Sequence, residues 1–346
     1  MRTGSRDGFG ARLHRRERGC GHKDEDRDLN IRPMQPGRRI DGISAVLLPF
    51  TVEGTPDWDG FSALLDRTWS AGLTPAVNMD TGYVHLLTVP ERAQALSIAR
   101  HQAAGRRFIA GAFIEGLEGD AVALYLAEID RIRKHGGVPI VFQSSALARL
   151  DEADVLEAYR AIGNAGPPLM AFELGRMFAG FGRIHSTEFF RKLLDVEAFV
   201  GLKHSSLDRV SEWTRLDLRD RHRPDFRVYT GNDLAIDMVF YGSDYLLGLS
   251  AFSVEGFAAR DRLWCRSDAR AVGLNDLLQY LGQVAFREPV PAYRHSAAQF
   301  LKLKGIIASD SPHPRSPRRP DSDVALLEDI ARRLDEAEAE APVELS

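Results

Sequence analysis

The chain has 346 residues, of which 44% are hydrophobic and 27% charged, and its formal net charge is −4. This composition excludes a disordered chain, a collagen and a disulfide scaffold, and the near balance of charge gives the whole chain no drive toward nucleic acid. No apolar run approaches the roughly 18–20 residues of a membrane span, and the start of the chain lacks the apolar core of a secretory signal. Cys20 and Cys265 are too few for a disulfide framework, so we expect a cytoplasmic protein.

The first segment, residues 1–40, carries eleven Lys or Arg against six Asp or Glu and almost no apolar periodicity. Such a segment cannot bury enough surface to offset the entropy lost on ordering, so we expect a disordered, basic N-terminal arm that folding does not need. It is either a solvated leader or an arm that binds nucleic acid or a membrane. We favour the leader and expect neither of those partners.

Between residues 41 and 308, short apolar runs alternate with helical stretches. The runs are continuous rather than alternating, as is typical of strands in a parallel sheet covered by helices. They span residues 43–50, 75–79, 107–113, 138–143, 168–174, 198–203, 226–230 and 244–250. Eight strand–helix units over about 250 residues predict an α/β fold, a closed (β/α)8 TIM barrel. The alternative, an open doubly wound sheet, would usually carry a GxGxxG turn, which PFTVEGTPD after the first strand lacks.

The C-terminal part differs in composition from the barrel. Residues 309–322 (SDSPHPRSPRRPDS) are predicted to be a Pro-rich linker open to proteases. Residues 323–346 follow as a short helix, with Leu327, Ile330 and Leu334 on one face, and a polar tail. We expect this additional C-terminal helix to dock on the barrel or on a neighbouring subunit.

Lys203 is the foremost catalytic candidate, because it ends the apolar run FVGLK and barrel enzymes place their active sites at the carboxyl ends of the strands. Burial there would lower the pKa of the ammonium group and yield a nucleophilic amine. Such an amine can form a Schiff base with a carbonyl substrate. The alternative is a lysine at a strand end that simply reaches solvent.

Other chemistries have weaker support in the sequence. The ten histidines form neither HxxxH nor HxH, although barrel ligands can come from distant strands. AGFGR at residues 179–183 lacks the Lys-Ser/Thr of a P-loop, and no GxSxG is present. We therefore expect no metal and no cofactor.

Several segments, in order, resemble the dihydrodipicolinate synthase / N-acetylneuraminate lyase family of class I, Schiff-base aldolases. MDTGYVHLLTVPERAQAL is similar to the family's TTGE turn and the helix after it, and VGLKHSSLD to the segment with its Schiff-base lysine. ISAVLLPF, YTGNDLAIDMVFYGSDYLLGLSAF and FLKLKGII resemble its first strand, last two strands and C-terminal signature. The match runs from about Gly42 to Leu334, and it implies that Lys203 forms the Schiff base in a divergent member.

The turn that binds the substrate carboxylate in this family departs from the family pattern. Asp80 replaces the first Thr and would repel a substrate carboxylate. Thr81 and Gly82 remain as candidates for binding it through a hydroxyl and backbone N–H groups. Tyr83 stands in place of the family's Glu, and His204 in place of the acid after the lysine.

The fifth strand lacks the family's catalytic tyrosine, which relays protons to and from the bound keto acid. Phe172 stands at that position and cannot transfer a proton. Glu173, Tyr83 or His204 could compensate, although alternation points Glu173 away from Phe172. Arg176 lies one residue from the arginine that binds a second carboxylate in some members, and Ser250, after the last strand, is a further candidate for substrate binding.

The leading hypothesis is a Schiff-base lyase of the aldolase, dehydratase or hydratase type that acts on a 2-oxo acid or related carbonyl compound through Lys203. Two departures, Asp80 and Phe172, predict that it is not an authentic dihydrodipicolinate synthase. The alternatives are a catalytically silent barrel that binds a keto acid or sugar acid, and a metal-dependent barrel enzyme. The resemblance also implies a homodimer or homotetramer.

Overall fold

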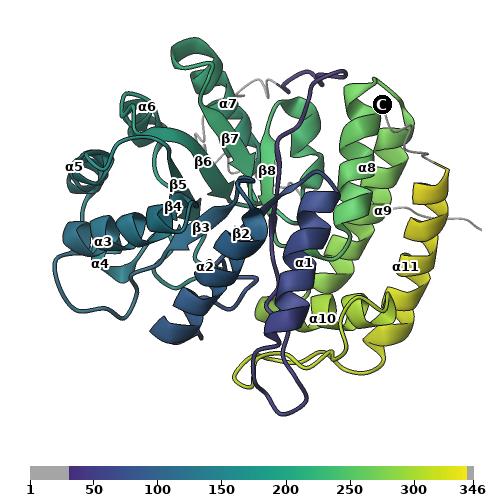
Figure 1. Ribbon diagram of the computed structural model, residues 1–346. Coiled ribbons are helices and arrows are strands. Elements are labelled where there is room, and N and C mark those ends of the chain that lie inside the picture. Colours follow the sequence, from purple (N-terminus) through teal and green to yellow (C-terminus); the bar gives the residue numbers. More distant parts are fainter. Residues whose placement is uncertain (1–30, 341–346) are drawn as a thin grey trace, which may run out of the picture. The chain divides into compact units, whose positions relative to one another are not determined.

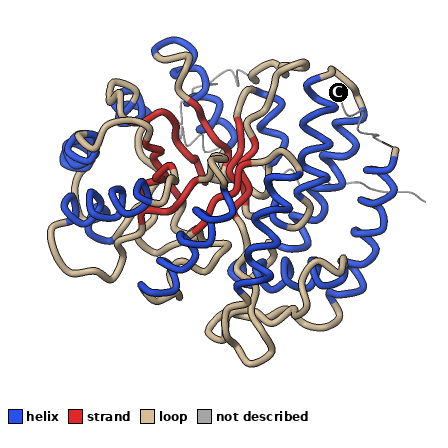
Figure 2. The backbone as a smooth tube through the Cα atoms, in the orientation of Figure 1, coloured by secondary structure: helices blue, strands red, loops and turns tan. Residues whose placement is uncertain are grey.

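The structure, a computed structural model, describes residues 31–340, and residues 32–340 belong to one compact unit. Within this part of the chain, eight parallel strands close in chain order into a barrel surrounded by helices (Figures 1 and 2). The strands are β1 (Gly42–Ala45), β2 (Thr74–Val77), β3 (Ile109–Ala112), β4 (Val138–Val141), β5 (Leu169–Leu174), β6 (Phe199–Ser205), β7 (Arg227–Thr230) and β8 (Asp244–Leu247). Each overlaps one of the predicted runs, and the predicted (β/α)8 fold with C-terminal helices is confirmed.

The helices that cover the sheet begin at side chains that cap them. Asp57 accepts a hydrogen bond from Gly60 N before the first helix, and Thr88 forms a capping box with Glu91 before the second. The barrel helices are α1 (Trp58–Ser70), α2 (Val89–Ala103), α3 (Ala121–Lys134), α4 (Ser145–Ala148), α5 (Glu152–Gly163), α6 (Thr187–Leu193), α7 (Arg209–His222) and α8 (Val254–Cys265). The additional C-terminal helices are α9 (Arg270–Ala285), α10 (Tyr293–Leu303) and α11 (Asp323–Ala339).

The sheet separates two apolar layers, which explains why its strands are apolar on both faces. One cluster fills the barrel and includes Ile43, Ile109, Ile140, Met170 and Leu246. The larger cluster lies between the sheet and the helices, where α1 buries Phe61, Leu64 and Leu65. A strand that faces two apolar layers is held in place on both sides, so residues at its carboxyl end can be positioned accurately.

The chain before β1 packs against the barrel from residue 32 onward. Gln35 N donates to Phe240 O at 2.8 Å, and Gly37 N donates to Trp264 O at 2.9 Å. Arg38 Nη1 lies 2.8 Å from Asp244 Oδ1. The part of the predicted disordered arm that spans residues 32–40 is therefore attached to the barrel, while the rest of that arm, residues 1–30, lies outside the described residues.

The Pro-rich segment 309–322 also differs from an exposed linker. Arg319 is 6% exposed and donates through Nη2 to Ala285 O at 2.8 Å. His313 packs edge-on against Phe50, with ring centroids 5.1 Å apart. The segment follows the barrel surface because its arginine and histidine side chains find carbonyl and aromatic partners there. Helix α11 then packs against α8, α9 and α10 through Leu327, Ile330 and Leu334.

Candidate active site

A cavity of about 270 Å³ opens at the carboxyl ends of the barrel strands and contains Lys203. Its walls come from the ends of the strands, from the segment after β5, and from the region between α9 and α10. Four of the ten predicted site residues line the cavity: Asp80, Thr81, Phe172 and Lys203. The other six do not line it: Gly82, Tyr83, Glu173, Arg176, His204 and Ser250.

Lys203 lies on the inner face of β6, and its side chain is almost fully enclosed. It is 9% exposed, and Nζ sits 4.4 Å from the ring centroid of Phe172, its neighbour across β5 and β6. Burial lowers the pKa of Lys203 to about 8, although Asp233 and Asp80 act in the opposite direction. Roughly a tenth of the amine is therefore uncharged at pH 7, far more than for a lysine with an ordinary pKa, and the uncharged amine is the nucleophilic form.

The path of the lysine side chain depends on a glycine in the neighbouring strand end. A Cβ at Gly231 would lie 2.0 Å from Ser205 Oγ and 2.7 Å from Lys203 Cε. Such distances are far inside van der Waals contact, so a side chain at this position would displace the lysine. The TGND segment after β7 thus provides the space in which Lys203 extends.

Asp233 is a cavity residue that the sequence analysis did not select. It is 7% exposed, and its Oδ1 accepts a hydrogen bond from Leu249 N at 2.8 Å. Burial raises its pKa to about 6, against the effect of this hydrogen bond and of Lys203. The available signal was an acidic residue directly after an apolar strand, but no motif distinguished it from other polar residues at strand ends.

Asp80 forms a cluster with two residues of α10. Tyr293 Oη lies 2.9 Å from Asp80 Oδ2 and 3.0 Å from Thr81 Oγ1. Arg294 Nη1 donates to Asp80 Oδ1 at 3.1 Å. Burial acts to raise the pKa of Asp80, but Arg294, His85 and Tyr293 outweigh it and hold that pKa below its usual value.

This cluster changes the expected electrostatics of the turn. The sequence suggested an unpaired carboxylate at Asp80 that would repel a substrate carboxylate. In the structure the Arg294 guanidinium offsets the charge of Asp80, so the repulsion is smaller than the sequence implied. The cluster also places a tyrosine hydroxyl in the cavity, and burial raises the pKa of Tyr293 well above its ordinary value.

Tyr83 and Gly82 support the turn from behind. Tyr83 adopts a positive φ of 60° and packs edge-on against Phe50, with Arg294 lying 5.0 Å from its ring centroid. A Cβ at Gly82 would lie 3.2 Å from Val46 O, so this turn runs close to the strand backbone. These positions explain why neither residue lines the cavity and why we assign Tyr83 no proton-transfer role.

Glu173 and His204 lie on the other face of the sheet, among the helices. Glu173 Oε1 is 2.7 Å from His204 Nδ1 and 2.6 Å from Arg215 Nε. Burial acts to raise the pKa of Glu173, but Arg215 and His204 outweigh it and hold the pKa well below its usual value. His204 Nε2 in turn lies 2.7 Å from Ser206 Oγ. The network is buried and connects β5, β6 and α7. Its hydrogen bonds and ion pair explain why Glu173 and His204 are present without a catalytic role.

The two remaining candidates also lie apart from the cavity. Arg176 is exposed, in the segment after β5. Ser250 is fully buried, and its hydroxyl donates to Leu247 O at 2.9 Å, which satisfies it locally.

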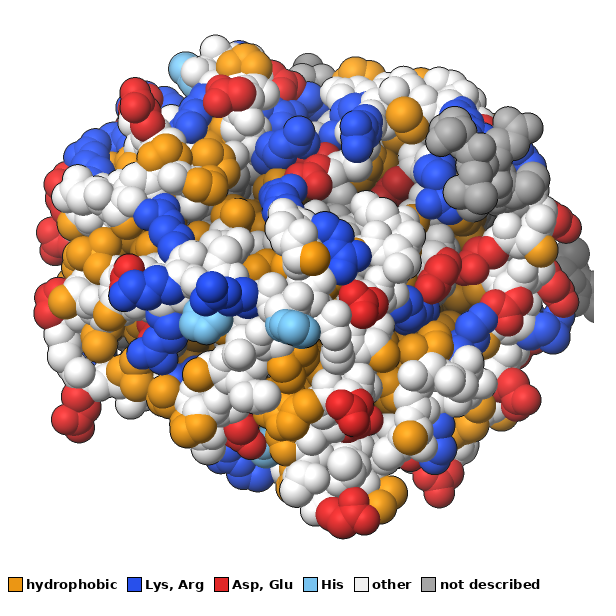
Figure 3. All heavy atoms as spheres, in the orientation of Figure 1, with side chains coloured by type: hydrophobic (Ala, Val, Ile, Leu, Met, Phe, Trp, Pro, Cys, Tyr) orange, Lys and Arg blue, Asp and Glu red, His pale blue; other side chains and the backbone are white. Residues whose placement is uncertain are grey.

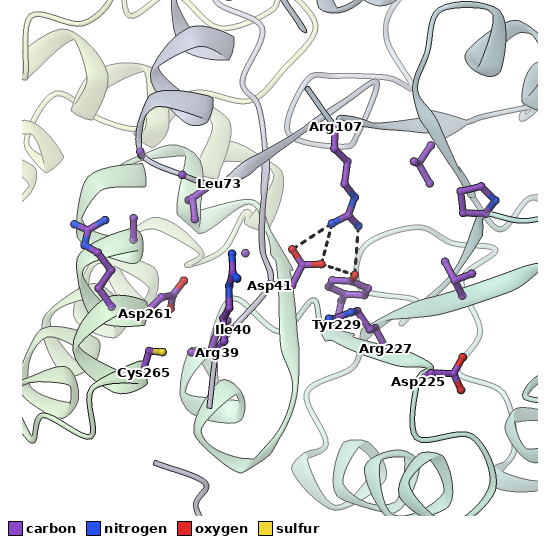
Figure 4. A pocket seen from close by; sticks show the side chains of 18 residues that line it. Arg39, Ile40, Asp41, Leu73, Arg107, Asp225, Arg227, Tyr229, Asp261 and Cys265 are labelled. Carbon is purple, nitrogen blue, oxygen red and sulfur yellow. Dashed lines mark hydrogen bonds and ion pairs between the residues drawn. The ribbon is translucent and has the colours of Figure 1, made fainter. Parts of the chain in front are cut away.

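A larger cavity of about 1030 Å³ lies at the opposite, amino-terminal end of the barrel (Figure 4). Several of its charged side chains are paired: Asp41 Oδ2 lies 2.9 Å from Arg107 Nη1 and 2.8 Å from Tyr229 Oη. Arg227 similarly pairs with Asp244 at 2.6 Å. This end of a (β/α)8 barrel usually serves stability rather than catalysis, so we place the chemistry at the Lys203 cavity.

Two further findings concern the whole described part of the chain. Residues 31–340 contain no group of three or more His, Cys, Asp or Glu side chains arranged to hold a metal ion. None of the described helices is both long and apolar enough to cross a membrane.

On the face shown in Figure 3, basic and acidic side chains are interspersed, consistent with the near balance of charge in the sequence.

No protein-family model and no curated protein matches this sequence. Solved structures of dihydrodipicolinate synthases do match it. The enzyme from Thermotoga maritima has 18% identity and a TM-score of 0.74, over 86% of this chain and 99% of its own. YagE from E. coli K12, a prophage protein of that family solved in complex with pyruvate, has 18% identity and a TM-score of 0.74, over 85% and 98%.

A third match is the 4-hydroxy-tetrahydrodipicolinate synthase of Methylacidiphilum fumariolicum SolV, with 15% identity and a TM-score of 0.72, over 88% of this chain and 98% of its own. At these identities the similarity establishes a shared fold. The chain is a (β/α)8 barrel built like the dihydrodipicolinate synthases, and the predicted resemblance is confirmed at the level of the fold.

Proposed function

We propose that this protein is a Schiff-base lyase of the aldolase, dehydratase or hydratase type that acts on a 2-oxo acid or related carbonyl compound. The observation that carries the proposal is the buried Lys203, which ends β6 inside the cavity with its pKa lowered to about 8. YagE, which shares the fold, was solved with pyruvate, and this supports a 2-oxo acid as the substrate class.

In the proposed reaction, the uncharged amine of Lys203 adds to the substrate carbonyl carbon. The carbonyl oxygen takes one proton from the amine and one from solvent, and it leaves as water. The product is an iminium ion, which draws electrons from the adjacent C–C or C–H bond when that bond breaks. Asp233 is a buried carboxylate close enough to influence the lysine, and it is suited to accept and return the protons of the addition and dehydration steps.

For proton transfer at the carbon next to the iminium, we assign Tyr293 together with Asp80. The tyrosine oxygen takes the proton from carbon while its own proton passes to Asp80 Oδ2, 2.9 Å away. The two electrons of the C–H bond form the enamine, so the step needs no further reactant. Thr81, whose Oγ1 lies 3.0 Å from Tyr293 Oη, orients this hydroxyl.

The direct test is reduction with cyanoborohydride in the presence of pyruvate, read by intact mass and peptide mapping. We expect one adduct, on Lys203, and its loss in Lys203→Ala. Lys302→Ala is the matched control, because this lysine is half exposed, pairs with Asp310 and does not line the cavity. An adduct that persists on another lysine in Lys203→Ala would contradict the proposal.

A second candidate function is a catalytically silent barrel that binds a keto acid or sugar acid. It is favoured by Phe172, which puts an apolar ring 4.4 Å from Lys203 Nζ where the family carries a hydroxyl. A silent protein would bind 2-oxo acids yet exchange no substrate C–H hydrogen with D2O.

The predicted homodimer or homotetramer is a separate question, and measurement of the molecular mass by light scattering would test it.

A further inference from the structure

The Lys203 cavity is divided into a polar side and an apolar side. The polar side is formed by Asp80, Thr81, Asp233, Tyr293 and Arg294, from the ends of β2 and β7 and from α10. The apolar side follows β3, β4 and β5 and the segment after β5. It includes Phe113, Phe142, Phe172, Leu174, Phe178 and Phe181. Among the described lining residues in this part of the chain, the one with a charge is Glu115, whose Oε2 accepts a hydrogen bond from Ser145 N at 2.7 Å. Lys203 lies between the two sides, so a substrate larger than pyruvate that is bound at this lysine can contact both.

Three phenylalanines of the apolar side, Phe113, Phe142 and Phe172, pack against one another as a wall. The rings of Phe113 and Phe142 meet edge to face at 5.6 Å, and those of Phe142 and Phe172 at 4.9 Å. All three phenylalanines are 6% exposed or less. Interlocked aromatic rings of this kind keep a fixed surface, and they bind flat or branched apolar groups by excluding water.

The charges of the cavity leave no cation for a second substrate carboxylate. Among the described residues that line it, the cationic side chains are Lys203 and Arg294, and the carboxylates are Asp80, Glu115 and Asp233. His85 also lines it, but burial lowers the pKa of its imidazole, and its Nδ1 faces Asp80 Oδ1 at 3.4 Å. Arg294 is paired with Asp80, and Lys203 is the proposed nucleophile. Arg176 is exposed and does not line the cavity. A dicarboxylate would place its second charge against the phenylalanine wall without a partner, which is costly.

We infer that the substrate carries a bulky apolar group, aromatic or branched aliphatic, on the side of the carbonyl that faces this wall, and no second carboxylate. The inference rests on the proposed function, because it names the substrate class of the Lys203 site. The positive charge of the iminium ion and the hydroxyl of Thr81 bind the single carboxylate, and the phenylalanine wall binds the apolar group.

The test compares 2-oxo-4-phenylbutanoate with 2-oxoglutarate, which share a two-carbon arm and differ in its phenyl or carboxylate end. Adducts on Lys203 are trapped with cyanoborohydride over a range of concentrations, with pyruvate as the reference. We expect half-saturation at a concentration at least about tenfold lower for the phenyl compound, as burial of a phenyl ring allows. Equal half-saturation, or a preference for 2-oxoglutarate, would overturn the inference.

Phe178→Arg places a cation in the apolar wall and should reduce the preference or reverse it. Leu207→Arg is the matched control, because Leu207 is 52% exposed and lies outside the cavity, and it should keep the wild-type ratio. If Phe178→Arg does not fold, Met177→Arg replaces it, since Met177 lines the cavity and is 44% exposed. An unchanged ratio in a folded arginine variant would also overturn the inference.

The outcome also separates this inference from the proposed function. If pyruvate is trapped but the phenyl compound is not preferred, the lyase proposal stands and the substrate class is wrong. If no 2-oxo acid is trapped, the lyase proposal fails, and the cavity is tested by calorimetry on Lys203→Ala with 4-phenylbutanoate and glutarate. Tighter binding of 4-phenylbutanoate supports the apolar specificity, and equal or weaker binding rejects it.

Discussion

The assignment of proton transfer to Tyr293 can be tested by Tyr293→Phe, which removes only the hydroxyl. This hydroxyl lies 2.9 Å from Asp80 Oδ2 and 3.0 Å from Thr81 Oγ1. A hydrogen bond to a charged group contributes about 1.5–3 kcal/mol, so we expect the free energy of unfolding to fall by about 2 kcal/mol. Asp80 keeps its ion pair with Arg294, so the fold should persist with Tm lowered by roughly 3 °C.

The informative assay for this variant is exchange of the methyl hydrogens of pyruvate with D2O, followed by NMR. A positioned acid–base group typically contributes about 10²–10⁴ in rate, so exchange should slow by at least a hundredfold. The fraction of Lys203 trapped at saturating pyruvate should stay near the wild-type value, because formation of the iminium does not require this hydroxyl.

The matched control is Tyr280→Phe, since Tyr280 lies on α9 and is 42% exposed. It should change neither exchange nor trapping. Exchange by Tyr293→Phe within tenfold of wild type, in a folded protein, would refute the assignment and direct attention to Asp233.

The remaining predictions concern the lysine, the space around it, the buried network and the reaction itself. Because burial lowers the pKa of Lys203 to about 8 from its ordinary 10.5, the initial rate of adduct formation should rise with pH and level off above about 8; a rate that still rises through pH 10 would contradict this. Between those two values the unfolded chain binds the proton that the folded chain has lost, so this group makes stability increase with pH. Gly231→Ala should slow adduct formation by at least about tenfold, because its Cβ would lie 2.0 Å from Ser205 Oγ and displace the lysine; stopped trapping reactions measure this, and a wild-type rate would show that the strand end yields easily. Glu173→Gln should destabilise the fold by about 3–5 kcal/mol in urea unfolding, because the buried Arg215 guanidinium loses its carboxylate; a loss below about 1 kcal/mol would show that the network is unimportant. Finally, kcat/KM for condensation of pyruvate with aspartate semialdehyde should be more than tenfold below that of an authentic dihydrodipicolinate synthase assayed in parallel, because the strand-five tyrosine is missing.

The barrel could be predicted from the sequence because its strands carry continuous apolar runs at regular intervals. The same pattern identified Lys203, since a lysine that ends such a run must be either buried in the barrel mouth or directed to solvent. Alternation along β5 also indicated that Glu173 points away from Phe172. These inferences succeed because each depends only on residues close together in the sequence, whose relative directions are set by the geometry of a single strand.

Tyr293 and Arg294 could not be predicted in the same way. They lie more than 200 residues from Asp80, and they meet it only because α10 packs across the barrel mouth. That packing depends on tertiary contacts such as the stacking of Phe286 on Tyr293, with ring centroids 4.4 Å apart. The attachment of residues 32–40 and 309–322 was missed for a related reason, because polar segments can be held by hydrogen bonds to distant backbone groups.

Because Tyr293 lies on α10, the proposed nucleophile and the proposed proton-transfer group are positioned by different parts of the fold. The lysine is fixed by a strand whose packing involves the whole barrel, so few changes there are tolerated. The hydroxyl is fixed by a helix outside the eight repeats, and sliding or rotating that helix would alter the proposed proton transfer while the strands stay as they are. If both proposed roles hold, a barrel arranged in this way can acquire new reactivity through its C-terminal helices and still retain the same lysine as nucleophile.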